Sequence, residues 1–443
     1  MVNFMLFLIF SIIYLIMLSI MVVFERNKPK NIILWAVLFL FTSAMGYAVY
    51  LISRIIVNKK KNSLKTKILE DEIYTNLSSK VLVNNETNLK GELFEFNKLA
   101  FNAVSTQNNS FDFFNSYEDY KKDLITTIKK ANKTILLELV KINALDFEEI
   151  KEALIEKAKS DVIIKLVHDK HINSKLVKQL KVAGVKVYKF SKYNTLDGVY
   201  SNLRNIICVD GETVYLGNLN VTSNQLNNKY DVCDCLLKIK GDIVQTINLE
   251  LHKDVVFASG KYIDYSQSKN EVSNLGVVQY ITNQYEKDLE LLIIKAISSA
   301  KKSIQLQVEE FIPTESLISL LNFAINSNIQ VRLMVPLRAK NTDKFYATRA
   351  YAKELALLGA NVYLYDGYIR FNSIVVDNEY VLYGSYLLDR EYIDTALQNI
   401  IIIKDSKAVN HLNKLFDASI DNSYRINNAN FMLLREKFFK NIV

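Results

Sequence analysis

Residues 202–220 read NLRNIICVDGETVYLGNLN, and residues 369–387 read IRFNSIVVDNEYVLYGSYL. The two stretches align without a gap at an offset of 167 residues. The aligned positions that are identical include Asn205/Asn372, Ile207/Ile374, Asp210/Asp377, Glu212/Glu379, Val214/Val381 and Gly217/Gly384. Strand-like residues flank Asp-Gly in one stretch and Asp-Asn in the other, and both dipeptides favour tight hairpin turns. The chain is therefore predicted to contain two copies of one β-hairpin, produced by an internal duplication.

The segments upstream of the two hairpins also repeat. Helical spacing between Tyr117 and Ala131 is followed by the strand-like run Thr134–Val140, and the same order returns at 292–300 and 303–308. A second helix and strand follow in each copy, at 147–158 and 162–167 and at 316–326 and 330–335. A third helix leads to apolar runs at 183–188 and 359–363. Such alternation predicts an α/β fold of two lobes, each a mixed sheet flanked by helices.

The two hairpins resemble the motif of the phospholipase D superfamily, and within it the bacterial cardiolipin synthases. That motif is His-x-Lys-x4-Asp-x6-Gly-x2-Asn, once per lobe. In the first copy its positions fall on Leu203, Asn205, Asp210, Gly217 and Asn220. In the second copy they fall on Arg370, Asn372, Asp377, Gly384 and Leu387. The spacing is kept in both copies, whereas the His and the Lys are absent from both.

The resemblance extends over essentially the whole chain. Asp234 and the segment Phe311-Ile-Pro313 fall where the family has similar residues, and the loop that begins at Glu25 looks like part of the family's N-terminal anchor. The resemblance implies two tandem phospholipase D-like α/β/α lobes whose motifs meet across a pseudo-two-fold axis. In this family one His attacks the phosphodiester and the other protonates the leaving alcohol, while Lys and Asn hold the phosphate. Cardiolipin synthases transfer a phosphatidyl group between two phosphatidylglycerols.

The substituted motif positions cannot supply this chemistry. A nucleophile and a general acid need pKa values near the working pH; Leu203 has no titratable group, and Arg370 stays protonated. We therefore expect a cardiolipin synthase-like pseudoenzyme that binds anionic phospholipid or regulates an active phospholipid synthase. The alternative is a functional cardiolipin synthase, a phosphatidyltransferase that uses atypical residues. The candidate phosphate ligands are Arg370, Asn205, Asn372 and Asn220, and a salt bridge from Arg370 to Asp377 or Glu379 is the competing interpretation of Arg370.

The N-terminus carries two long uncharged runs, 1–24 and 32–53, which predict a two-helix transmembrane hairpin. Residues 1–67 contain nine basic residues and one acidic residue, which accounts for the whole net charge of +8. The lysine-rich segment after the second run predicts that the body of the chain lies in the cytoplasm, against the inner face of the cell membrane. The expected partners are an anionic phospholipid membrane and an active synthase or a second copy of this chain.

The remaining features favour few other functions. Residues 68–443 carry no net charge, so nucleic-acid binding is not favoured. The three cysteines form no metal-binding pattern, and Cys233 and Cys235 are expected to be core residues. The four histidines have no metal-ligand spacing, so no metal or cofactor is predicted. The aromatic and basic segment 431–443 predicts an amphipathic helix that lies on the membrane or packs on the second lobe. The predicted domains are an anchor at 1–57, a basic and Asn-rich connector at 58–110, and lobes at 111–265 and 275–443.

Overall fold

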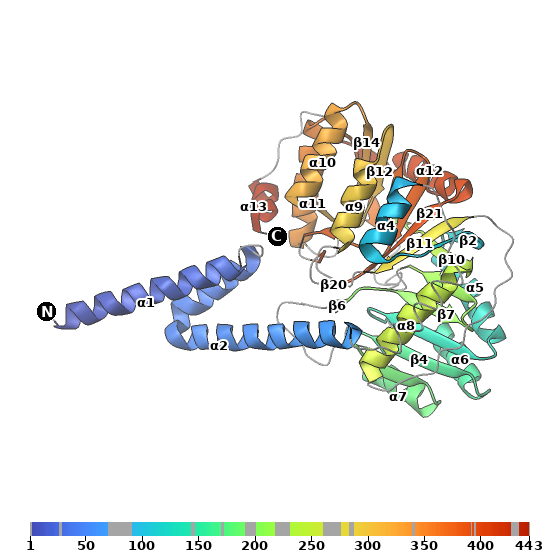
Figure 1. Ribbon diagram of the computed structural model, residues 1–443, viewed down its shortest axis with the longest axis horizontal. Helices are drawn as coiled ribbons and strands as arrows, with labels where there is room; N and C mark the ends of the chain where they lie inside the picture. The colour runs from blue at the N-terminus through green and yellow to red at the C-terminus, as the bar shows by residue number, and fades with distance from the viewer. Residues whose placement is uncertain are drawn as a thin grey trace.

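The computed structural model describes residues 2–25, 29–69, 91–142, 147–169, 172–190, 201–217, 231–259, 276–282, 288–338, 342–390, 392–393, 396–426 and 434–442. Two α/β lobes form the body, and the N-terminal helices α1 (Val2–Glu25) and α2 (Pro29–Leu69) project from it (Figure 1).

The first lobe has a seven-stranded mixed sheet in the order β2-β10-β8-β7-β3-β4-β5. The strands β3, β4 and β5 are parallel to one another, and the remaining pairings are antiparallel. Its strands are β2 (Asn109–Phe114), β3 (Thr134–Leu139), β4 (Ile163–His168), β5 (Lys186–Lys189), β7 (Ile206–Val209), β8 (Thr213–Leu216) and β10 (Leu236–Gly241). Its helices are α5 (Tyr117–Lys130), α6 (Glu148–Ala158), α7 (Ser174–Val182) and α8 (Ile243–Ser259).

The second lobe repeats this arrangement in a nine-stranded sheet, β1-β11-β21-β18-β17-β12-β14-β15-β22. Its strands are β11 (Val277–Thr282), β12 (Ser303–Gln307), β14 (Gln330–Pro336), β15 (Asn361–Tyr365), β17 (Asn372–Val376), β18 (Tyr380–Gly384), β21 (Asn399–Lys404) and β22 (Ser423–Arg425). Its helices are α9 (Asp288–Ser298), α10 (Glu315–Asn326), α11 (Thr342–Leu357), α12 (Ser406–Ile420) and α13 (Leu434–Ile442). The strands from β11 to β15 follow the same spatial order as those from β2 to β5, which confirms the duplication.

Both predicted hairpins are present, as β7–β8 and β17–β18. Their turn residues lie in the left-handed region, with φ of 55° at Asp210 and 67° at Gly211, and of 53° at Asp377 and 55° at Asn378. Positive φ at both central positions is the geometry that matches the twist of the flanking strands, and Asp, Asn and Gly tolerate it best. The turn dipeptides in the sequence thus fix the register of both hairpins.

The prediction that residues 58–110 form only a connector is wrong over residues 92–106. This stretch forms α4 (Glu92–Phe101), which packs on α9, and β1 (Ser105–Thr106), which pairs with β11 at the edge of the second sheet. Leu93 and Phe94 are buried in the core of the second lobe. The short helix and the two-residue strand carry too little periodicity to be recognised among the surrounding Asn residues.

The two lobes share one apolar core. Ile239 and Val214 of the first lobe belong to the same buried cluster as Val381 and Ile401 of the second, and the Tyr383 hydroxyl donates to the Cys235 carbonyl at 2.6 Å. Two short parallel ribbons also join the lobes. They are β6 (Ser201–Asn202) with β20 (Ala396–Leu397), and β9 (Asp231–Cys233) with β16 (Gly367–Ile369). A further ribbon, β13 (Phe311–Ile312) with β19 (Leu388–Asp389), lies within the second lobe.

The helix α2 is sharply bent, which differs from the straight second span predicted at 32–53. The rings of Trp35 and Tyr50 lie 5.1 Å apart, although a straight helix would separate these residues by about 22 Å. Phe39 and Tyr47 are also in contact, so α2 folds back between them, as Figure 1 shows. This aromatic cluster, together with Met21 of α1, is buried between the helices.

Within the described part of the chain, no helix combines the length and the apolar character needed to cross a membrane. The two-span anchor is not confirmed and stays a prediction.

Candidate functional site

The two degenerate motifs begin at the ribbons that join the lobes. Leu203 directly follows β6, and its N–H donates to the Leu397 carbonyl at 2.8 Å. Arg370 directly follows β16, and its N–H donates to the Cys233 carbonyl at 3.1 Å. The first position of each motif is therefore held by backbone bonds to the opposite lobe, in two corresponding places.

Leu203 lies in a small apolar cluster that contains residues of both lobes. Leu203 is 8% exposed and forms a buried cluster with Val140 of the first lobe and Ala396 of the second, against which the partly buried Leu387 and Tyr392 pack. Leu387 stands at the Asn position of the second motif. Two motif positions that carry polar groups in the family are thus occupied by leucines of one cluster, which offers no proton donor or nucleophile.

Arg370 forms a buried ion pair with Asp234, and not with Asp377 or Glu379 as one interpretation of the sequence predicted. The Arg370 side chain is 6% exposed, and Asp234 is similarly buried. Burial raises the pKa of the Asp234 carboxyl, while the neighbouring Arg370 charge lowers it. Sequence spacing failed here because Asp234 comes from the opposite lobe, across the β9–β16 ribbon.

The Nε and Nη1 atoms of Arg370 are buried without a hydrogen-bond partner. A buried donor that lacks a partner costs about 1–3 kcal/mol, and more when it is charged. These two atoms lie on the same guanidinium that Asp234 holds through Nη2. Among the described residues, neither atom has an acceptor, which sets this guanidinium apart from a fully paired structural arginine.

Asn205 and Asn372, at the Lys positions of the two motifs, play matching structural roles. The Asn205 Oδ1 accepts the Val140 N–H at 3.1 Å, and the Asn372 Oδ1 accepts the Glu309 N–H at 3.0 Å. Both side chains are buried. They brace the chain just beyond β3 and β12, so their carbonyl oxygens are engaged with the backbone.

Asp210 and Asp377 are also structural. Asp210 accepts N–H groups from Asn132, Lys133 and Thr134 at 2.8–2.9 Å. Asp377 accepts the equivalent groups of residues 301–303 at 2.7–2.8 Å. Each aspartate ties the hairpin turn to the start of the neighbouring central strand, at the end of the strands opposite to Asn205 and Asn372. Asn220 lies outside the described residues.

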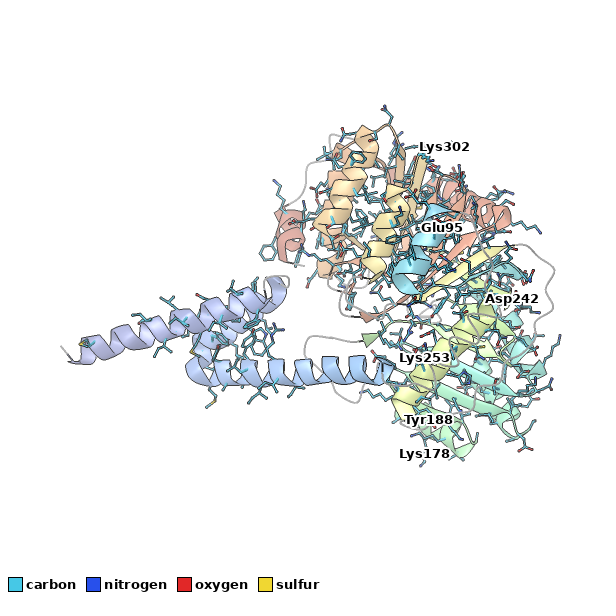
Figure 2. All side chains as sticks on the ribbon, viewed as in Figure 1. Glu95, Lys178, Tyr188, Asp242, Lys253 and Lys302 are labelled. Atoms are coloured by element: carbon cyan, nitrogen blue, oxygen red, sulfur yellow. The ribbon has the colours of Figure 1, made fainter. Side chains whose placement is uncertain are left out.

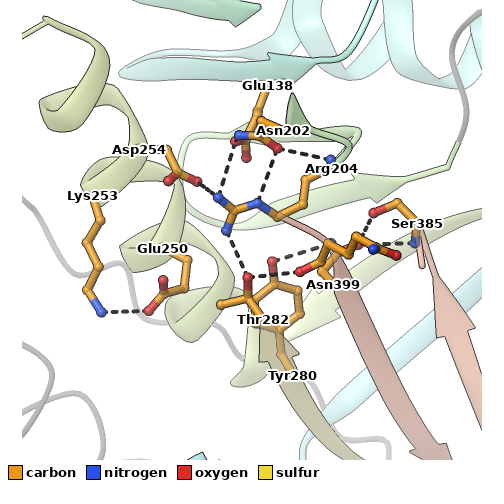
Figure 3. A network of polar contacts seen from close by, with 11 residues as sticks. Glu138, Asn202, Arg204, Glu250, Lys253, Asp254, Tyr280, Thr282, Ser385 and Asn399 are labelled. Carbon is orange, nitrogen blue, oxygen red and sulfur yellow. Dashed lines mark hydrogen bonds and ion pairs between the residues drawn. The ribbon is translucent and has the colours of Figure 1, made fainter. Parts of the chain in front are cut away.

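A buried polar network beside the first motif was not predicted from the sequence, and Arg204 lies at its centre. Its guanidinium lies 2.7 Å from Asp254 and 3.7 Å from Glu138, and donates to the Thr282 hydroxyl at 3.0 Å (Figure 3). Asn202 bonds to both Glu138 and Arg204. Burial and the nearby Glu138 charge raise the pKa of Asp254 well above its usual range, although Arg204 opposes this.

A second buried network lies in the second lobe. Lys344 pairs with Asp389 and, at 3.3 Å, with Glu310, and its ammonium lies 3.8 Å from the centre of the Tyr392 ring. Burial raises the pKa of Glu310 to about 7, with Lys344 acting in the opposite direction. The sequence pointed to this region only through the Phe311-Ile-Pro313 segment, which resembles a segment of the family and directly follows Glu310. Because Tyr392 also touches the Leu203 cluster, this network adjoins the motif region.

The cysteines do not replace the missing nucleophile. All three are buried, as was expected for Cys233 and Cys235. Burial raises the pKa of Cys233 to about 11 and that of Cys208 to about 12, so neither thiol ionises near neutral pH. His252 and His411 lie on helices, where they bond to the Asn248 carbonyl and to the Asn115 side chain. Across the described residues, no cluster of three or more His, Cys, Asp or Glu side chains is placed to hold a metal ion.

Comparisons with known proteins agree with this architecture. Residues 124–254 and 293–420 match the family described as cardiolipin synthase, PLD-like domain. A cardiolipin synthase of Oceanobacillus iheyensis is 28% identical over 443 residues, covering 92% of this chain and 91% of that protein. The major cardiolipin synthase ClsA of Bacillus subtilis is 29% identical over 418 residues, covering 84% of each.

A crystal structure of phosphatidylserine synthase from Haemophilus influenzae superimposes with a TM-score of 0.59 at 13% identity, over 79% of this chain and 97% of that one. This likeness shows the fold. The family match covers more than half of the chain and falls on both lobes. The chain therefore belongs to the cardiolipin synthase, PLD-like domain family.

Proposed function

We propose that this protein is a membrane-anchored, catalytically inactive relative of cardiolipin synthases that binds anionic phospholipid. The observation that carries the proposal is that Leu203 and Leu387 lie in one apolar cluster at the junction of the lobes. These residues replace a His and an Asn of the family motif. In their place stands a buried apolar contact between the lobes, which can neither attack a phosphodiester nor donate a proton.

The replacement of both Lys positions by Asn removes two positive charges that would stabilise a phosphate in the transition state. Removing one electrostatic stabiliser of a transition state typically costs about 100-fold or more in rate. Asn205 and Asn372 carry no charge, and both amide oxygens are engaged with the backbone. The combined substitutions should abolish phosphatidyl transfer.

Lipid binding is supported by Arg370. Arginine presents donors in a planar fork that suits phosphate oxygens, and the Nε and Nη1 donors of this residue are unpaired. An entering phosphate would join the Arg370–Asp234 pair at the second motif. A protein that holds phospholipid without turnover is suited to bind and regulate an active synthase. A second copy of this chain is the other partner that we propose.

Membrane anchoring is supported by the N-terminal helices. Many of their large apolar side chains are exposed, among them Leu15 at 62%, Leu40 at 74% and Phe41 at 84%. Exposed apolar surface of this extent is typical of contact with lipid or with another protein. We place the anchor in the cell membrane as two crossings, with residues 68–443 in the cytoplasm.

The second candidate is an active cardiolipin synthase that uses atypical residues. It is favoured by the similarity to cardiolipin synthases over nearly the full chain. The two candidates differ in one measurable product, cardiolipin.

The deciding experiment is lipid mass spectrometry on the full-length protein reconstituted in phosphatidylglycerol vesicles, with an active synthase as the positive control. We expect no cardiolipin above the level of protein-free vesicles. Cardiolipin that accumulates with time and protein concentration would overturn the pseudoenzyme proposal.

Binding is tested separately by native mass spectrometry of phosphatidylglycerol retained by the detergent-solubilised protein. We expect Arg370→Gln to lower retention about tenfold, a change that corresponds to loss of one charged hydrogen-bond contact. The control is Arg425→Gln, an exposed arginine of β22. Equal retention by both variants would exclude Arg370 as the lipid ligand.

A further inference from the structure

We propose that the outward face of α13 docks on the surface of an anionic membrane and so fixes the second lobe against the bilayer. This inference rests on the proposed membrane attachment of the N-terminal helices. The sequence left two alternatives for segment 431–443, a surface helix or a helix packed on the second lobe. The contacts of α13 show that its two faces have different environments.

The inward face of α13 is fixed by buried polar contacts to α11. Glu436 is fully buried and pairs with Lys353 at 2.7 Å and with Arg349 at 3.2 Å. Three residues further on, the Phe439 ring stacks on Tyr346 at 5.7 Å, and Lys440 pairs with Glu354 at 2.6 Å. These positions follow the helical spacing of one face. The helix is therefore a fixed part of the second lobe.

The outward face of α13 carries one large aromatic side chain between two cations. Phe438 is 59% exposed, and both Arg435 and Lys437 are exposed. An exposed aromatic residue flanked by basic residues is the composition of helices that lie in a membrane interface. Glu436 and Phe439 already hold the helix on the lobe. The exposed part of the Phe438 ring is therefore not needed to fix the helix there.

The position of α13 indicates that its outward face would meet the same membrane as the N-terminal helices. The helix contacts α2, and Figure 1 shows it on the side of the second lobe that faces the N-terminal helices. Those helices expose a continuous series of apolar side chains. The charged residues labelled on the lobes, such as Lys178, Asp242 and Lys302, are of both signs and lie away from this side (Figure 2). A bilayer that receives α1 and α2 would meet α13 at its edge, where anionic headgroups complement Arg435 and Lys437.

The test uses the single tryptophan of the chain, Trp35, which lies on α2. Phe438→Trp in a Trp35→Phe background moves this fluorophore to α13. The full-length protein is reconstituted in vesicles of phosphatidylcholine and phosphatidylglycerol, with bromine on the lipid chains close to the headgroup. We expect the bromolipid to quench the fluorescence of the Phe438→Trp variant at least about twofold more than that of a Val182→Trp control in the same background. Val182 is 83% exposed on α7, which lies at the edge of the first lobe away from the second lobe and from α13 (Figure 1).

Two comparisons separate the possible failures. Quenching of Trp35 in the unmodified protein by bromine deep in the lipid chains reports membrane insertion of the N-terminal helices, so its absence would overturn the proposed anchoring. Quenching of Trp35 without quenching of the tryptophan introduced on α13 would overturn the α13 proposal alone. Adding Arg435→Glu and Lys437→Glu to the Phe438→Trp variant should reduce its quenching in phosphatidylglycerol-containing vesicles. Unchanged quenching would show that the cations do not recognise the anionic surface.

Discussion

Single residues in this protein show that a motif can keep its spacing and its structural aspartates while other motif positions are substituted. Asp210 and Asp377 each bind three backbone N–H groups and occupy left-handed turn positions, which are requirements of the fold. Leu203 and Arg370, which stand where the resembling motif has His, are instead part of a buried apolar cluster and of a buried ion pair. The aspartates thus keep a role in the fold that does not depend on the residues at the His positions.

We expect Asp210→Ala to destabilise the protein by about 2–3 kcal/mol, because three N–H groups lose their acceptor and the turn loses a residue that tolerates positive φ. Asp210→Asn should cost less, since Asn keeps one acceptor oxygen and the turn preference. Urea denaturation of the detergent-solubilised full-length protein measures both variants. Equal losses from the Ala and Asn variants would contradict this assignment.

Glu310 should make stability depend on pH. Burial raises its pKa to about 7 from an ordinary value of 4.5, so the folded state binds an extra proton between these values. Stability should therefore fall as pH rises from about 4.5 to 7, by at most about 1.4 kcal/mol per pH unit from this group. Glu310→Gln should flatten this dependence, as measured by urea denaturation at several pH values. Glu152→Gln, at an exposed position of α6, is the control and should leave the wild-type slope unchanged.

At the scale of elements, the bent helix α2 decides how the anchor can meet a membrane. Arg54 donates to the Phe24 carbonyl at 3.1 Å, so the later part of α2 lies beside the end of α1. Two crossings, as predicted from the sequence, would place the end of α1 outside the cell. The fold-back of α2 would instead place it on the same side as residue 54, next to the cytoplasmic body. The topology predicted from the sequence and the observed bend of α2 therefore imply different arrangements of the anchor in a membrane.

Thiol labelling in intact cells tests the two-crossing topology that we propose. A cysteine at Lys28 should react with an impermeant maleimide from outside, and a cysteine at Asn3 should react only after the cells are permeabilised. The buried native cysteines keep the background low. Reaction at Asn3 and protection at Lys28 would contradict two crossings and would favour a single crossing followed by a re-entrant α2.

At the scale of the whole molecule, the lobes depend on each other. They share an apolar core, and Arg204 of the first lobe links the buried carboxylates Glu138 and Asp254 to Thr282 of the second. The backbone ribbons between the lobes hold the motif positions at the same junction. Loss of catalytic residues has therefore not released the constraint that keeps the two halves together.

We expect Arg204→Met to destabilise the protein by about 3–5 kcal/mol, because it leaves two buried carboxylates without their cation. The loss should be smaller at pH 5 than at pH 8, since the pKa of Asp254 is already raised and a protonated Asp254 needs no partner. Urea denaturation at both pH values gives the comparison. Arg332→Met removes a more exposed ion pair with Asp417 and should cost about 1 kcal/mol or less at either pH. A pH-independent loss at Arg204 would contradict the proposed role of Asp254.

Much of the fold was predictable because the duplication is local in sequence. The hairpins at 206–216 and 372–384, and the helices and strands before them, each carry their own periodicity and turn residues. The family and the loss of its motif residues also follow from linear spacing. The helix α4 and the strand β1 were missed, since their place in the second sheet depends on contacts with β11 and α9, which are distant in the chain.

The sequence by itself determined the duplication, the α/β class, the turn geometry and the absence of His and Lys from the motifs, because each depends on residues that are neighbours along the chain. Only the tertiary structure decided that Leu203 and Leu387 share an apolar cluster, that Arg370 pairs with Asp234, and that α2 turns back on itself. These contacts join residues separated by more than a hundred positions or by a bend in a helix. Which side chains meet across the lobes is set by how the two sheets pack, and no local pattern encodes that packing.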